Sequence, residues 1–119
     1  MTKLSKEEEY NILIKDLSCH DYGFFKISHE GNDRCGITPK EDDFPITIRC
    51  PKSGDYMELS YGTKKVSRLF IDAKIPAHLR KNWPVVVNCK GEIILIPKIA
   101  KNKDYLLAKP TWFVIQLFH

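Results

Sequence analysis

Two short apolar runs joined by a polar turn constrain this chain most. The segment "WPVVVNCKGEIILIP", residues 83–97, places one strand at 85–87 and a second at 92–96, which is apolar after Glu92. Residues 88–91 lie between them, and Gly91 can adopt the positive φ that a tight turn needs. The pattern predicts a β-hairpin, so the fold must contain a sheet that accommodates it.

Further strands are expected on both sides of this hairpin. In "PITIRC", residues 45–50, apolar and polar residues alternate, which predicts a half-buried strand with Arg49 facing solvent. Strands are also expected at 22–28 and around 56–61, the second after a turn that Asp55 closes. The tail "TWFVIQLF", 111–118, is apolar enough for a strand covered on both faces.

Three polar or mixed segments do not show a clear strand pattern. Residues 5–14, "SKEEEYNILI", fit a helix that begins with a Ser5–Glu8 capping box, but "YNILI" fits a strand equally well. The polar runs 29–43 and 98–105 are predicted as a long loop and a linker.

Residues 63–82 change to helical periodicity. Thr63 is the expected N-cap of a helix whose i, i+3, i+4, i+7 stripe comprises Val66, Leu69, Phe70 and Ala73. Pro76 suits the first turn of a second short helix in "PAHLRKN". Phe70 and Trp83 are expected in the core.

The same segment is strongly basic, with Asp72 its single acidic residue between positions 64 and 81. The basic residues are Lys64, Lys65, Arg68, Lys74, Arg80 and Lys81. On a helix, the first three share the face opposite the apolar stripe, and Asp72 is expected to pair with Arg80 or Lys65. Arg49 and Lys52 could extend this face. It is typical of a surface that binds a polyanion, although a merely solvated basic face fits equally well.

Charge is also divided unevenly along the 119 residues. Residues 1–60 hold 8 basic and 12 acidic side chains, and residues 61–119 hold 11 and 3, so the halves carry −4 and +8. The length predicts a single domain, 1–119. The sequence shows neither an apolar run long enough for a membrane span nor a signal-peptide pattern, so a cytoplasmic location is expected.

The sequence offers no pattern of a catalytic or metal site. The cysteines, Cys19, Cys35, Cys50 and Cys89, form no C-x-x-C pair, and the glycines form no phosphate-binding loop. We therefore expect a binding module without catalytic residues, bound metal or cofactor. The fold class predicted is α+β, a mainly antiparallel sheet or sandwich with two short helices packed on it.

An ordered series of motifs over residues 44–99 is more specific. It comprises Arg49, Gly54-Asp55, Gly62, Lys64-Lys65, Phe70-Ile71-Asp72, Lys74-Ile75-Pro76, Arg80, Trp83-Pro84-Val85 and Gly91-Glu92-Ile93. In this series the chain resembles the C-terminal domain of bacterial tRNA(Ile)-lysidine synthetase. Residues 1–43, an N-terminal strand or helix and loop region, and 100–119, a C-terminal strand, are assigned to the same domain by position alone.

The resemblance implies a function. The parent enzyme uses ATP to ligate lysine to the wobble cytidine of tRNA(Ile), in an N-terminal catalytic domain with an S-G-G-x-D-S loop that this sequence lacks. The chain would then be a fragment that is inactive alone and docks the acceptor-stem end of the tRNA through the six cations. The resemblance also implies a fold similar to a domain of the phenylalanyl-tRNA synthetase β-subunit.

Two other functions are compatible with the sequence. One is a protein-interaction or dimerisation domain, for instance a homodimer, in which an exposed "TWFVIQLF" tail pairs edge to edge with a partner. The other is a domain that binds a small anion.

Overall fold

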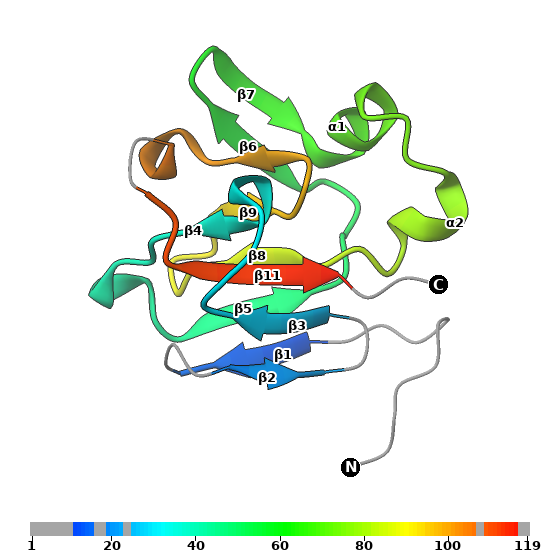
Figure 1. The fold of residues 1–119 in the computed structure, drawn as a ribbon. Helices are drawn as coiled ribbons and strands as arrows, with labels where there is room; N and C mark the ends of the chain where they lie inside the picture. The colour runs from blue at the N-terminus through cyan, green and yellow to red at the C-terminus, as the bar shows by residue number, and fades with distance from the viewer. Residues whose placement is uncertain (1–10, 16–18, 23–24, 107–108, 117–119) are drawn as a thin grey trace.

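The strands form three sheets in which every pair is antiparallel (Figure 1). The computed structural model describes residues 11–15, 19–22, 25–106 and 109–116. The five-stranded sheet has the order β1 (Asn11–Ile14), β5 (Ile46–Arg49), β8 (Val85–Val87), β9 (Ile93–Ile96), β10 (Ala100–Lys101). The four-stranded sheet has the order β2 (His20–Asp21), β3 (Phe25–Ser28), β11 (Trp112–Gln116), β4 (Gly36–Ile37). The two-stranded sheet is the hairpin β6 (Tyr56–Leu59) and β7 (Gly62–Lys65).

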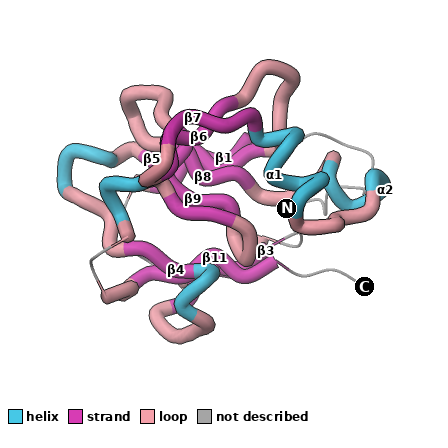
Figure 2. Tube along the Cα trace, turned by 90° about the horizontal axis from the view of Figure 1, so that it is seen from above, coloured by secondary structure: helices cyan, strands magenta, loops and turns pink. Residues whose placement is uncertain are grey.

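These sheets stack in three layers, with the five-stranded sheet in the middle (Figure 2). One core fills the space between the two larger sheets and includes Phe25, Ile37, Ile48, Val86 and Trp112. A second core lies on the opposite face of the middle sheet, under the β6–β7 hairpin and helix α1 (Val66–Asp72), and includes Met57, Phe70, Trp83, Val85 and Ile96. Burial of Phe70 and Trp83 is confirmed, with their rings 5.9 Å apart in an edge-to-face arrangement.

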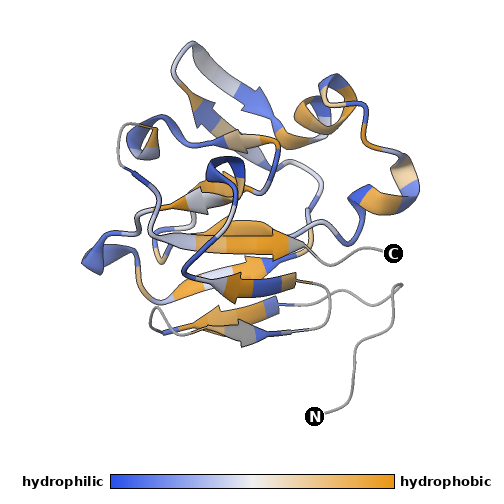
Figure 3. Ribbon diagram, in the orientation of Figure 1, coloured by the Kyte–Doolittle hydropathy of each residue, from blue (hydrophilic) through white to orange (hydrophobic). Residues whose placement is uncertain are grey.

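The predicted β8–β9 hairpin is confirmed, and it is buried on both faces. Gly91 has a φ of 85° in its turn. Val86 faces the first core, whereas Val85 and Val87 face the second. A β-bulge shifts the register, since Val86 pairs with Leu95 but Val87 pairs with Ile93. Because of the extra residue in β9, the neighbours Ile94 and Leu95 both face the first core, while Ile93 and Ile96 face the second. Figure 3 shows this apolar character across the larger sheets, whereas β7 is white to blue.

Helix α1 begins later than predicted. Thr63 is not its N-cap, because Gly62–Lys65 pairs with Tyr56–Leu59 as strand β7. The N-cap is Lys65, which makes no side-chain capping hydrogen bond, and Ala73 is an exposed C-cap rather than part of the buried stripe. The short second helix is confirmed as α2 (Ala77–Arg80), with Pro76 as its N-cap.

The two polar runs contain regular structure that composition did not predict. Residues 29–43 hold the 3₁₀ turns η1 (Asp33–Cys35) and η2 (Glu41–Asp43) and strand β4. Residues 98–105 hold β10 and η3 (Lys103–Tyr105). Gly36 explains how β4 fits, because a Cβ built there would lie 2.4 Å from the Phe113 ring. Residues 11–14 form a strand, which resolves the ambiguity there, while Ser5 and Glu8 lie outside the described residues.

The C-terminal strand is interior to its sheet. β11 pairs with β3 on one side and with β4 on the other, and Trp112, Phe113 and Val114 are buried. The prediction of a strand covered on both faces is therefore confirmed for these residues. The hypothesis of an exposed tail is wrong for residues 112–114, which are buried. β4 covers one edge of β11 only at Trp112 and Phe113, so edge-to-edge pairing with a partner stays a prediction.

A buried carboxylate ties three loops together. Tyr105 donates its hydroxyl proton to Asp43, whose two carboxylate oxygens lie 2.7 and 2.8 Å away. Asp43 also accepts from the backbone N–H of Lys40 at 2.8 Å, and its carbonyl accepts from Cys89. Burial, together with this carboxylate, raises the pKa of Tyr105 far above its ordinary value.

Among the described residues, no helix is long and apolar enough to cross a membrane.

Candidate functional site

The predicted basic face divides at the end of β7. Lys64 and Lys65 lie in a strand, where successive side chains point to opposite faces. Lys64 pairs with buried Met57 and so lies on the inner face of the hairpin. Lys65 pairs with Tyr56, which is 52% exposed, and lies on the outer face. The prediction that these two lysines share one helical face is therefore wrong.

Lys64 and Arg68 converge on Asp72. The Lys64 ammonium forms an ion pair with one carboxylate oxygen of Asp72, and Arg68 Nε lies 3.6 Å from the other. The hydrogen bond from Lys64 is the main reason why the pKa of Asp72 lies below its usual value. Asp72 thus pairs with neither Arg80 nor Lys65, contrary to expectation. The contact joins β7 to α1 and leaves Arg68, whose side chain is 65% exposed, facing solvent.

Lys74 occupies the left-handed position that ends α1. Its φ is 59°, its N–H donates to Ile71 O at 3.0 Å, and the Ile75 N–H donates to Phe70 O at 3.0 Å. These two bonds form a Schellman motif, the usual way for a helix to stop and reverse direction. The motif fixes the backbone of an exposed lysine next to the partly buried Ile75.

Arg80 and Lys81 differ in their roles. Arg80 is half-buried, and its Nε donates to Ile75 O at 2.7 Å, so it holds the loop between α1 and α2. Lys81 is exposed at the end of α2. No ion pair of Lys65, Lys74 or Lys81 occurs within the described part of the chain.

Arg49 does not extend the basic surface. Its guanidinium makes a bidentate pair with Asp55, at 2.9 and 3.0 Å, and both side chains are largely buried, at 13% and 11% exposure. The prediction that Arg49 faces solvent is wrong, because this pair covers it. Asp55 also accepts from the Lys52 N–H at 2.7 Å and closes the predicted turn. Lys52 itself is exposed.

We define the basic surface as Lys65, Arg68, Lys74 and Lys81, the outward-facing cations along β7, α1 and α2. Two exposed aromatic residues that the sequence analysis did not single out adjoin it. Tyr56 pairs with Lys65 across the hairpin, and Tyr61, 75% exposed, lies in the β6–β7 turn. The tyrosines of the predicted strand 56–61 were a signal in the sequence for such a contact. That they point outward follows only from the pairing of β6 with β7.

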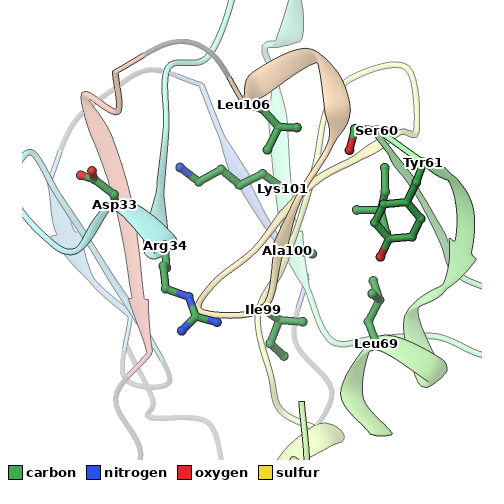
Figure 4. A pocket seen from close by; sticks show the side chains of 10 residues that line it. Asp33, Arg34, Ser60, Tyr61, Leu69, Ile99, Ala100, Lys101 and Leu106 are labelled. Atoms are coloured by element: carbon green, nitrogen blue, oxygen red, sulfur yellow. The ribbon is translucent and has the colours of Figure 1, made fainter. Parts of the chain in front are cut away.

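A pocket of about 420 Å³ opens beside this surface (Figure 4). Tyr61 and Ser60 line one side, and Asp33 and Arg34 of η1 line the other. Lys101 extends from β10 toward Arg34 and Asp33. The remaining lining is apolar and comprises Leu59, Leu69, Ile99, Ala100 and Leu106.

Thiols and acidic groups form no further site in the part of the chain that the structure describes. No group of three or more His, Cys, Asp or Glu side chains there is placed to hold a metal ion. Cys35 and Cys50 are buried, Cys19 and Cys89 are exposed, and none of these four described cysteines forms a disulfide. Burial raises the pKa of Cys35, while the nearby cations Lys98, Arg34 and Lys101 oppose that shift.

The chain matches one protein family and several named relatives. Residues 46–116 match the family model described as the TilS substrate C-terminal domain. The chain is 42% identical over 90 residues to a tRNA(Ile)-lysidine synthase of Bacillus subtilis, covering 72% of this chain and 19% of the relative. It is 40% identical over 81 residues to the synthase of Exiguobacterium sibiricum, covering 68% and 19%. It thus spans about a fifth of the length of these relatives.

The arrangement of the strands matches a solved structure as well. A crystal structure of a TilS C-terminal domain superposes with a TM-score of 0.69, covering 94% of this chain and 99% of that one, at 22% identity. At that identity the likeness concerns the fold. It agrees with the predicted class, since the chain is built mostly of antiparallel sheets with few short helices.

Proposed function

The chain belongs to the family of the TilS substrate C-terminal domain, and from that membership we propose that it binds tRNA, docking the acceptor-stem end on the basic surface. The matched relatives are named tRNA(Ile)-lysidine synthase. In this proposal a separate catalytic domain ligates lysine to the wobble cytidine of tRNA(Ile) with ATP. ATP and lysine would be bound in that catalytic domain.

The observation that carries this proposal is the outward direction of Lys65, Arg68, Lys74 and Lys81. Asp72 lies beside them but is already held by Lys64 and Arg68, and Glu58, on the outer face of the hairpin, is ion-paired with Lys103. Lys64 and Arg80 make contacts within the domain that position the elements carrying the others, and their own contact with RNA stays a prediction. The basic surface would therefore keep its positive charge toward a ligand.

An acceptor stem is an A-form helix, whose deep major groove excludes side chains. A protein that recognises such a stem reads its shape through phosphates and 2′-hydroxyls. Lysines and an arginine on a rigid hairpin and a capped helix are suited to that task, and they position the RNA without reading its sequence. The likeness to the phenylalanyl-tRNA synthetase β-subunit domain stays a prediction.

Binding of RNA tests the proposal directly. We expect the chain to bind whole tRNA at low salt and to bind an anticodon-arm hairpin of the same tRNA more weakly, as measured by fluorescence anisotropy. A minihelix that contains only the acceptor stem and T arm should bind as tightly as whole tRNA. Equal affinity for the anticodon arm and the minihelix would contradict acceptor-stem docking.

A further inference from the structure

The pocket beside the basic surface combines cations, an aromatic ring and an apolar floor. Its volume of about 420 Å³ lies within the range of small-molecule sites, about 300–1,000 Å³. We propose that it binds one unpaired nucleotide of the docked RNA, with a phosphate against Arg34 and Lys101 and the base against Tyr61. This inference rests on the proposed RNA-binding function and assigns to the same RNA a second point of contact.

The phosphate half of the site is held in place by backbone contacts. Arg34 Nη2 donates to Lys98 O at 2.8 Å, and the Lys98 N–H donates to Arg34 O at 3.0 Å. A guanidinium has five N–H donors, so this bond orients Arg34 and leaves others for a ligand. Lys101 extends into the same region, and with Asp33 the three charges sum to +1.

The base half of the site is aromatic and apolar. Tyr61 exposes three quarters of its surface in the β6–β7 turn, where no core requires a ring. Leu106, also exposed, and Ile99 line the pocket opposite the hairpin. Bases of any sequence stack on aromatic faces, so this arrangement favours an unstacked base without selecting its identity.

The position of the pocket links it to the basic surface. Leu69 of α1 lines the pocket, while its chain neighbour Arg68 belongs to the basic surface. A duplex held by the basic surface could therefore pass a single-stranded end into the pocket. Base-paired nucleotides are excluded from such a role, because their faces are already stacked.

The test compares three RNA hairpins that share one stem. The first is blunt, the second carries a four-nucleotide 3′ overhang, and the third carries an abasic overhang of the same length. The proposal predicts that the overhang with bases binds roughly 10-fold more tightly than the abasic one. That difference should vanish in Tyr61→Leu, and the gain of the abasic overhang over the blunt hairpin should vanish in Arg34→Gln/Lys101→Gln. Lys26→Gln/Lys90→Gln is the matched control and should preserve both differences.

Equal binding of all three hairpins by the unmodified chain would overturn the inference while leaving stem docking intact. If no hairpin binds, acceptor-stem docking fails, and titration with adenosine 5′-monophosphate decides the pocket separately. Shifts of the Tyr61 amide resonance that are lost in Arg34→Gln/Lys101→Gln would uphold it. An unmoved resonance in that case would overturn both proposals.

Discussion

Lys64, on the inner face of β7, is ion-paired with Asp72, in the last turn of α1. This single contact decides how the basic segment is used, because it removes one lysine from the outward charge and fixes the hairpin against the helix. The remaining cations, Lys65, Arg68, Lys74 and Lys81, then form a surface rather than one face of one helix.

Neutralising Asp72 should strengthen RNA binding. In Asp72→Asn the negative charge beside Lys64 and Arg68 is lost, so both become available to phosphates. We expect affinity for tRNA to rise several-fold at 100 mM salt, with little change in stability because the ion pair is exposed. Fluorescence anisotropy and thermal unfolding check the two expectations. Asp104→Asn, an exposed carboxylate outside the basic surface, serves as the control, and an equal gain there would point to net charge alone.

The salt dependence of binding should report the basic surface. If about four phosphates are neutralised, log K should fall against log salt with a slope of about −3 to −4, on the calibration for duplex DNA. Lys65→Gln/Lys74→Gln should reduce the magnitude of that slope by about 2, whereas Lys26→Gln/Lys90→Gln should not change it. An unchanged slope in the first double variant would exclude these lysines from phosphate contact.

Removing the Tyr105 hydroxyl should destabilise the domain. Tyr105→Phe leaves the buried Asp43 carboxylate without its donor in η3, which costs about 1.5–3 kcal/mol for a hydrogen bond to a charged group. Chemical denaturation at pH 7 measures the loss. An effect below about 0.5 kcal/mol would mean that the contact contributes little.

The same tyrosine should make stability fall at high pH. Its pKa is raised in the folded state above the ordinary value of 10, so the folded state holds the proton more tightly than the unfolded chain. This contribution to stability is complete below pH 10 and is lost as the pH rises further. Between pH 10 and 11 the free energy of unfolding should therefore fall more steeply in the unmodified chain than in Tyr105→Phe. Parallel curves would argue against the shift.

Gly36 should not tolerate a side chain. A Cβ there would lie 2.4 Å from the Phe113 ring and 2.7 Å from Pro110 Cβ, so Gly36→Ala must displace β4 from β11. We expect a loss of about 1–3 kcal/mol, typical of overpacking. Equilibrium unfolding in urea gives the value. Gly36→Ala with Phe113→Leu tests the cause, because the smaller side chain should restore part of the loss.

The sequence predicted those features that depend on local pattern. The period-two alternation predicted the strand at 46–49, and continuous apolar runs predicted those at 85–87, 93–96 and 112–116. The hydrophobic stripe predicted the buried residues of α1. The predicted start of the helix was wrong because Gly62–Lys65 is polar and shows no strand pattern. It becomes a strand only by pairing with Tyr56–Leu59. Two-residue strands such as β4 and β10 exist only through their partners, so no window of sequence reveals them.

The sequence predicted that the candidate site is rich in basic residues, but not the directions in which their side chains point. The excess of positive charge between positions 64 and 81 was visible at once, but strand alternation, not helical periodicity, decides that Lys64 turns inward and Lys65 outward. The pocket joins Arg34, Tyr61 and Lys101, which are far apart along the chain. Their juxtaposition follows from the stacking of the sheets, for which the residues themselves carry no local signal.

The middle position of β8 and β9 bears on how the domain holds together. Each strand sends side chains to both hydrophobic cores, so the sheet on one side and the hairpin and helix on the other share the same supports. Neither outer layer can detach without exposing apolar side chains of these two strands to water. The β6–β7 hairpin and α1, which carry most of the basic surface, are therefore anchored by the same buried strands as the first core.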